Sequence, residues 1–160
     1  MNGVKSVVKE IIRETFLKKA EDPILINFIN ELNIDLEKEY AAAIQYIQHG
    51  AMITGPQYMD IIEEILKHAD EEIAHAKIIS DRINYLGGIP SIAVSTIRTS
   101  PDSAAMIVQD KEGEEEAIER YKERIKQAEE LGDYGTKALL MDILKDEEEH
   151  RTDLMIALGE

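Results

Sequence analysis

Two copies of a Glu-x-x-His motif constrain this 160-residue chain more than any other feature of its sequence. The first copy is Glu72–His75 and the second is Glu147–His150. On an α-helix, residues i and i+3 project from the same face about one turn apart, so a carboxylate and an imidazole can bind the same ion. Another glutamate, Glu39 or Glu114, precedes each copy by 33 residues. The spacing predicts two similar helical hairpins, each with three metal-ligand side chains.

The hydrophobic pattern predicts four long helices. Apolar residues recur at intervals of three and four, as on the buried face of an amphipathic helix. Glycine, proline and capping residues interrupt this pattern where helices are expected to begin or end. Residues 87–100 show no helical period and are expected to form an extended connection. The expected helices span residues 23–53, 57–86, 101–131 and 134–158, with N-caps at Asp22, Ser100 and Asp133.

A short turn, a long crossover and a second short turn are the connections of a four-helix bundle built from two antiparallel pairs. We therefore expect residues 23–160 to form one all-α domain. Residues 1–22 are expected to form a short amphipathic helix that packs on this subunit or a neighbour. Because residues 1–20 carry five basic and two acidic side chains, a basic arm that touches a membrane or DNA is the alternative.

The turns bring the glutamates to one height in the bundle. The midpoint between Glu39 and Glu72 falls in the first predicted turn. The midpoint between Glu114 and Glu147 falls beside the second. Residues equally far from a turn lie side by side in an antiparallel pair, so all four carboxylates share one layer. With a histidine one turn beyond in each hairpin, the predicted ligands are Glu39, Glu72, His75, Glu114, Glu147 and His150.

Four buried carboxylates need cations, because each bare charge in an apolar interior costs several kcal/mol. Two divalent ions would neutralise them. Mixed imidazole and carboxylate ligands favour iron or manganese over calcium or magnesium, while zinc could also bind. The alternative is that the six are solvated surface residues of a glutamate-rich protein. That alternative explains any single residue, but not two identical spacings on otherwise apolar stripes.

Two tyrosines and a histidine are expected near the metal layer. Tyr46 and Tyr121 each lie seven residues, or two turns, after Glu39 and Glu114. Each is interpreted as a core tyrosine whose hydroxyl bonds a ligand carboxylate, or as a redox-active group that supplies an electron. His68, one turn before Glu72, is interpreted as a residue that supports the metal ligands or binds iron transiently, or else as a partly buried helix histidine.

Composition excludes several classes of function. The chain has no cysteine, so it forms no disulfide, zinc–thiolate or iron–sulfur site. No apolar run is long enough for a membrane span, and no signal peptide is recognised at the N-terminus, so a cytoplasmic location is expected. A net charge of -15 argues against nucleic-acid binding by the body of the protein.

The chain resembles the ferritin-like superfamily over about residues 24–158, in particular bacterioferritins and Dps-like ferritins with a bacterioferritin-type site. The segments that carry the resemblance are Lys38–Tyr46, Glu71–His75, Leu86–Pro90 and Lys145–His150. The resemblance implies two iron ions per subunit. Within the predicted ligand set, it assigns Glu39 and His75 to one ion and Glu114 and His150 to the other. The implied bridging ligands are Glu72 and Glu147.

The chain also departs from the family pattern. Bacterioferritins bind haem through a methionine directly after the ligand glutamate of the second helix, where this chain has Ile73, so haem is not expected. Only ten residues follow His150, which leaves no room for the fifth helix of larger storage ferritins. The cysteine pair of some Dps-like relatives is also absent. The shell size is therefore open between 12 and 24 subunits, the two family options.

The leading functional hypothesis is a ferroxidase that oxidises Fe(II) with O2 or H2O2 and stores the product as mineral in a hollow homo-oligomeric shell. The second is a peroxide-detoxifying enzyme on the same bundle, either a rubrerythrin-like peroxide reductase or a manganese catalase. A third is a metal-stabilised structural or DNA-coating bundle, which predicts DNA binding through residues 1–20 and no oxidation chemistry.

Overall fold

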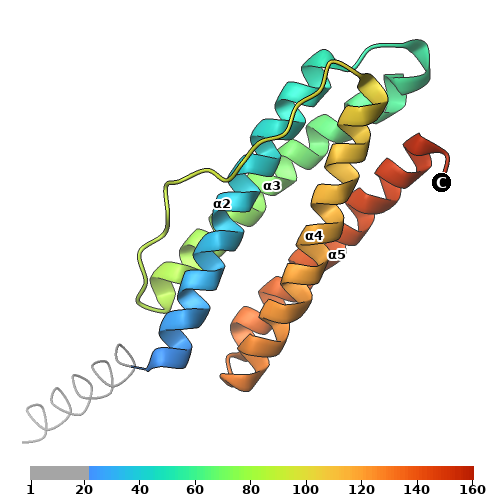
Figure 1. The fold of residues 1–160 in the computed structure, drawn as a ribbon. Coiled ribbons are helices and arrows are strands. Elements are labelled where there is room, and N and C mark those ends of the chain that lie inside the picture. The colour runs from blue at the N-terminus through green and yellow to red at the C-terminus, as the bar shows by residue number, and fades with distance from the viewer. Residues whose placement is uncertain (1–21) are drawn as a thin grey trace, which may run out of the picture.

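Four helices form an antiparallel bundle in a computed structural model that describes residues 22–160 (Figure 1). They are α2 (Pro23–Met52), α3 (Met59–Tyr85), α4 (Ser103–Glu130) and α5 (Tyr134–Leu158), and a short 3-10 turn, η1 (Pro56–Tyr58), precedes α3. These residues contain no strand, so the predicted all-α four-helix bundle is confirmed. The predicted N-terminal helix falls on residues outside the described part, apart from Asp22.

Aspartate side chains cap three of the four helices. Asp22 accepts a hydrogen bond from the backbone N–H of Ile24, and Asp133 accepts one from Thr136 N–H, as expected for N-caps. The cap expected at Ser100 was wrong by two residues. Asp102 caps α4 by accepting from Ala105 N–H at 2.7 Å, whereas the Ser100 hydroxyl accepts from the Asp102 N–H in the preceding turn.

A polar layer divides the apolar core into two clusters. The first cluster packs the start of α2 and α4's second half against the end of α3 and the first half of α5; its large members include Phe28, Leu32, Leu36, Ile79, Ile83, Tyr121 and Ile143. The second fills the other end and includes Tyr46, Ile61, Ile65, Met106, Ile107 and Leu154. Burying each such side chain contributes about 1.5–3 kcal/mol. No helix within residues 22–160 has both the length and the apolar character needed to cross a membrane.

The connection between α3 and α4 runs the length of the bundle along α2 (Figure 1). Asn33 donates to the Ile89 carbonyl, Ser95 N–H donates to the Glu37 carbonyl, and Arg98 N–H donates to Gln45 Oε1. These bonds attach the extended chain to one face of α2 from residue 33 to residue 45. The connection therefore returns the chain to the other end of the bundle, so that α4 and α5 repeat the hairpin made by α2 and α3.

Candidate metal centre

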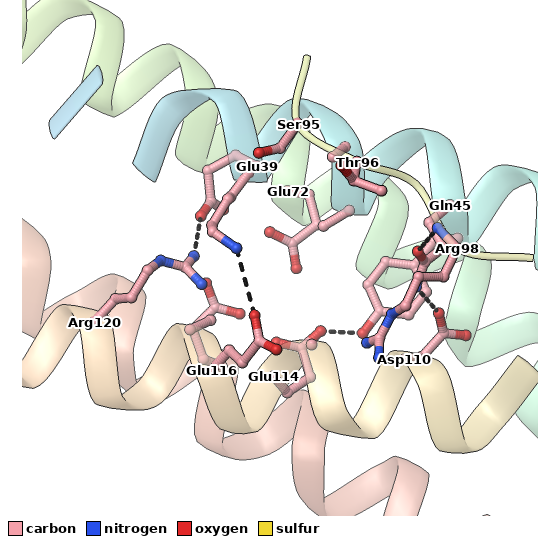
Figure 2. Close-up of a pocket in the computed structure, with 17 residues that line it drawn as sticks. Glu39, Gln45, Glu72, Ser95, Thr96, Arg98, Asp110, Glu114, Glu116 and Arg120 are labelled. Carbon is pink, nitrogen blue, oxygen red and sulfur yellow. Dashed lines mark hydrogen bonds and ion pairs between the residues drawn. The ribbon is translucent and has the colours of Figure 1, made fainter. Parts of the chain in front are cut away.

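Six side chains from all four helices converge at the middle of the bundle. The six are Glu39 on α2, Glu72 and His75 on α3, Glu114 on α4, and Glu147 and His150 on α5. Their ligand atoms form two overlapping groups, each within 4.8 Å, and Glu72 and Glu147 belong to both. None of the six is more than 3% exposed. The carboxylates of Glu39, Glu72 and Glu114 face the same space in Figure 2.

Each tyrosine of this layer holds a carboxylate of the opposite hairpin. The Tyr121 hydroxyl donates to Glu39 Oε1 at 2.6 Å, and the Tyr46 hydroxyl donates to Glu114 Oε1. Burial, followed by the neighbouring carboxylates, raises the pKa of both phenols well above their ordinary value. Both hydroxyls therefore stay protonated and act as donors. These contacts are those expected of core tyrosines whose hydroxyls bond ligand carboxylates. The redox role of the tyrosines stays a prediction.

The two histidines, one on α3 and one on α5, are each oriented by an acidic residue on the other of these two helices. His75 Nε2 lies 3.2 Å from Asp146 Oδ2 of α5, and His150 Nε2 lies 2.8 Å from Glu71 Oε2 of α3. A carboxylate that accepts the Nε2 proton leaves Nδ1 as the ligand atom on the side of the glutamates. Sequence reasoning did not assign a role to Glu71 or Asp146. The signal that could have identified them is their position directly before the two Glu-x-x-His motifs.

The inner ligand atoms have the spacing of a metal site rather than that of a hydrogen-bond network. Most of the buried side-chain polar atoms without a hydrogen-bond partner among the described residues belong to Glu39, Glu72, His75, Glu147 and His150. His75 Nδ1 lies 3.4–3.5 Å from three carboxylates, and His150 Nδ1 lies 3.2 Å from Glu72 Oε1. Ligands bound at about 2.0–2.2 Å and about 90–110° apart are about 2.8–3.6 Å from each other. The residues present therefore fit divalent transition-metal ions.

The ionisation of the protein groups alone also balances charge. Burial, then repulsion by neighbouring carboxylates, raises the pKa of Glu39 and Glu114 well above the ordinary value. Burial would also raise the pKa of Glu72, but contacts with the two histidines lower it below the ordinary value. Although burial opposes it, the surrounding carboxylates raise the pKa of His150 to about 12, and they raise that of His75 as well.

Without metal, these shifts favour the protonated form of Glu39 and Glu114 and the doubly protonated, charged form of both imidazoles. Two divalent cations would replace the two carboxyl protons and one proton of each imidazole with the same total charge.

A second pair of polar clusters lies on either side of the metal layer, between α2 and α4. On one side, Asp35 accepts from Arg124 Nε at 2.8 Å and from Arg120 Nε at 3.1 Å. On the other side, Asp110 lies 2.8 Å from both His49 Nδ1 and Gln45 Nε2. Sequence reasoning placed Asp110 on the buried stripe but gave neither cluster a role. The 75-residue repeat could have found them, because it relates Asp35 to Asp110.

A pocket of about 250 Å³ leads to the metal layer between α2, α4 and the connection. Its inner end is lined by the four glutamates of the layer, and its walls include Ser95, Thr96 and Arg98 of the connection (Figure 2). Lys38 and Glu116 form an ion pair of 3.4 Å between α2 and α4. The pocket gives small molecules a path from solvent to the buried carboxylates.

Comparisons with known proteins show the family of the chain. Residues 29–159 match the family model of the ferritin-like domain. A bacterial ferritin of Neisseria meningitidis serogroup B is 33% identical over 125 residues, which cover 78% of this chain and 79% of the relative.

Two solved structures are similar over nearly the whole fold. A ferritin-like, diiron-carboxylate protein of Bacillus anthracis superposes with a TM-score of 0.82 at 28% identity, covering 86% of this chain and 99% of the other. A dodecameric thioferritin of Bacteroides fragilis, a bacterioferritin-related protein, gives a TM-score of 0.81 at 30% identity, covering 92% and 93%. With its four-helix bundle and its matched domain, the chain belongs to the ferritin-like family and is of the bacterioferritin type.

Proposed function

We propose that this protein oxidises Fe(II) with O2 or H2O2 at a dinuclear centre and stores the Fe(III) product inside a homo-oligomeric shell. The observation that carries the proposal is the sharing of Glu72 and Glu147 by two ligand groups. Shared carboxylates suit two ions that react as a pair. Two bound Fe(II) ions would each supply one electron to the oxidant.

The protein's own side chains supply the ligands for the two ions and the charge that favours their oxidation. Glu39 with His75, and Glu114 with His150, would each hold one ion, while Glu72 and Glu147 would bridge the two. Four carboxylates with two neutral imidazoles favour the higher charge of the oxidised ions.

The tyrosine hydroxyls and the outer carboxylates of Asp146 and Glu71 fix the ligands in place. Preorganised ligands of this kind need no rearrangement when the ion's charge changes. Tyr46 and Tyr121 would supply a further electron under the redox interpretation.

The storage part of the proposal draws support from the relatives. One relative is a bacterial ferritin, and one structural neighbour is a dodecameric thioferritin. A chain of this type is proposed to assemble into a shell of 12 or 24 copies. We do not propose haem for it, because the isoleucine side chain of Ile73 cannot ligate iron.

Aerobic Fe(II) loading tests the proposal directly. The wild-type protein should oxidise two Fe(II) per chain rapidly, seen as Fe(III) absorbance, and electron microscopy should then show shells with electron-dense mineral. Glu72→Ala should abolish the rapid phase because it removes a ligand of both ions. Glu148→Ala is the matched control, since Glu148 is exposed on the outer face of α5. A Glu72→Ala protein with the wild-type rate would overturn the assignment of the site.

The same preparation separates storage from peroxide detoxification. The storage proposal predicts iron uptake with little O2 release from H2O2. Release of O2 from H2O2 by the manganese-loaded protein, without iron uptake, would contradict storage and favour a catalase.

A further inference from the structure

A third cluster of ligand-type side chains lies beside the metal layer, between α3 and α5. It consists of Glu64, His68 and Asp153, whose ligand atoms lie within 4.8 Å of each other. Glu64 and His68 are one turn apart on α3, and Asp153 lies three residues after His150 on α5. His68 Nε2 is 3.3 Å from Asp153 Oδ2. The cluster shares no residue with the two groups of the metal layer.

His68 is the buried member of this cluster. It is 2% exposed, and its Nδ1 has no hydrogen-bond partner in the described part of the chain. Its ring stacks on His150 with centroids 4.1 Å apart and meets the Tyr46 ring edge-on at 5.6 Å. A buried imidazole is usually satisfied by hydrogen bonds on both nitrogens. Here the single polar contact is to a carboxylate of the same cluster.

The fold does not require polar side chains at these three positions. The 75-residue repeat relates Glu64 to Leu139, His68 to Ile143 and Asp153 to Ile78. In that equivalent place on the bundle, Ile143 is 1% exposed and belongs to the apolar core, against which Ile78 also packs. The same helix crossing is thus built once from aliphatic residues and once from three metal-ligand types. Packing alone does not explain the second set.

We propose that Glu64, His68 and Asp153 bind one divalent first-row transition-metal ion, separately from the dinuclear centre. One nitrogen and carboxylate oxygens suit manganese, iron, cobalt or zinc better than magnesium or calcium. The carboxylates of Glu64 and Asp153 are about 40% exposed, so an ion can reach them from solvent. Glu64 now pairs with Lys67 at 2.7 Å, but an exposed pair of this kind contributes little and is easily replaced.

Cobalt(II) tests this site because it has a visible spectrum and an accessible anomalous absorption edge. The full-length protein, stripped of metal and titrated with cobalt, should bind a third ion per chain beyond the two of the metal layer. Crystals soaked in cobalt should show an anomalous peak between His68 and Asp153. No such peak, at cobalt concentrations that fill the metal layer, would overturn the proposal.

Variants connect that third ion to its ligands. Asp153→Asn and His68→Leu should each remove one equivalent of cobalt per chain and the corresponding peak. His68→Leu places at this position the kind of side chain that the repeat has at 143, so it should fold. Glu63→Gln, a matched change on an exposed neighbour, should leave all three ions. An unchanged third ion in Asp153→Asn would contradict the proposal.

The anomalous difference maps of the cobalt-soaked crystals also test this inference independently of the proposed function. Peaks in the metal layer report the dinuclear centre, and the third peak reports the cluster at His68. A third peak without the other two would support this inference and contradict the ferroxidase site. Two peaks without the third would do the reverse.

Discussion

The α2–α3 and α4–α5 hairpins are similar in the metal layer and different on either side of it. Within the layer, glutamates, tyrosines and histidines recur at a spacing of 75 residues. Beside it, Asp35 is bonded by two arginines, whereas the equivalent Asp110 is bonded by His49 and Gln45. The metal layer therefore needs the same ligands twice, while the flanking layers need only a buried carboxylate with donors around it.

The different residues around Asp35 and Asp110 should give the two metal positions unequal affinities for a cation. Arg120 Nη2 lies 3.7 Å from Glu39 Oε1 (Figure 2), and the repeat relates Arg120 to the neutral Gln45, which donates to Asp110. The arginine's positive charge opposes a cation bound by Glu39 and His75. We therefore expect the first ion to bind between Glu114 and His150.

Among the changes that compare the two hairpins, the largest effects should come from the two carboxylates that are proposed to hold one ion each. Glu39→Gln and Glu114→Gln should each lower the initial rate of Fe(II) oxidation by more than about 100-fold, since losing a ligand exceeds the cost of losing an outer partner. Stopped-flow absorbance measures the rate, and Glu115→Gln, an exposed neighbour, should be unaffected. If one of the two variants keeps the wild-type rate, the hairpins are not functionally equivalent.

Changes of the outer carboxylates should have smaller effects, and each should weaken the binding of a different ion. Asp146→Asn should weaken binding beside His75, and Glu71→Gln should weaken binding beside His150, each by about 10–100-fold. Calorimetric titration with cobalt measures both steps. Asp142→Asn, on the exposed face of α5, serves as the control. If either variant weakened the binding of both ions equally, the result would argue against the assignment of Asp146 to His75 and of Glu71 to His150.

Replacing Arg120 tests the inequality of the two positions. Arg120→Gln gives Asp35 the donor that Asp110 already has, and it removes the positive charge beside Glu39. The ratio of the two stepwise metal affinities should fall by up to about tenfold, equivalent to about 1.4 kcal/mol. Lys122→Gln removes a positive charge from the exposed face of α4 and should leave the ratio unchanged. A ratio that Arg120→Gln does not alter would remove this explanation.

The last expected effect is on the stability of the protein stripped of metal, not on its metal binding or oxidation rate. Glu39, Glu114, His75 and His150 have raised pKa values, so the folded state holds more protons than the unfolded state above about pH 5 for the carboxyls and above about pH 6.5 for the imidazoles. Stability from these groups is then lost as pH rises, by up to about 1.4 kcal/mol per pH unit for each proton.

Thermal unfolding from pH 5.5 to 8.5 measures this loss. The Tm should fall as pH rises, and the Glu39→Gln, Glu114→Gln double variant should show a shallower fall because two of the titrating groups are gone. A Tm that rises over this range would contradict the assigned protons.

The sequence was sufficient for features that have a period or a fixed spacing. Helix positions followed from apolar stripes, and the equal heights of Glu39 and Glu72, and of Glu114 and Glu147, followed from their distances to the turns. Features set by contact between helices could not be predicted, because nothing in the chain's local pattern selects a partner. One interpretation of each tyrosine was a bond to a ligand carboxylate, but nothing indicated that the carboxylate belongs to the other hairpin. The pattern also gave no sign that Asp35 and Glu31 of α2 accept hydrogen bonds from the buried Arg124.

Anomalous diffraction at the iron edge, from crystals loaded anaerobically with Fe(II), tests the central assignment most directly. We predict two iron peaks in the metal layer of each chain, about 3.5–4 Å apart. One should lie beside Glu39 and His75, the other beside Glu114 and His150, with Glu72 and Glu147 between them. A single iron in the layer, or iron bound elsewhere while these six side chains hold none, would contradict it.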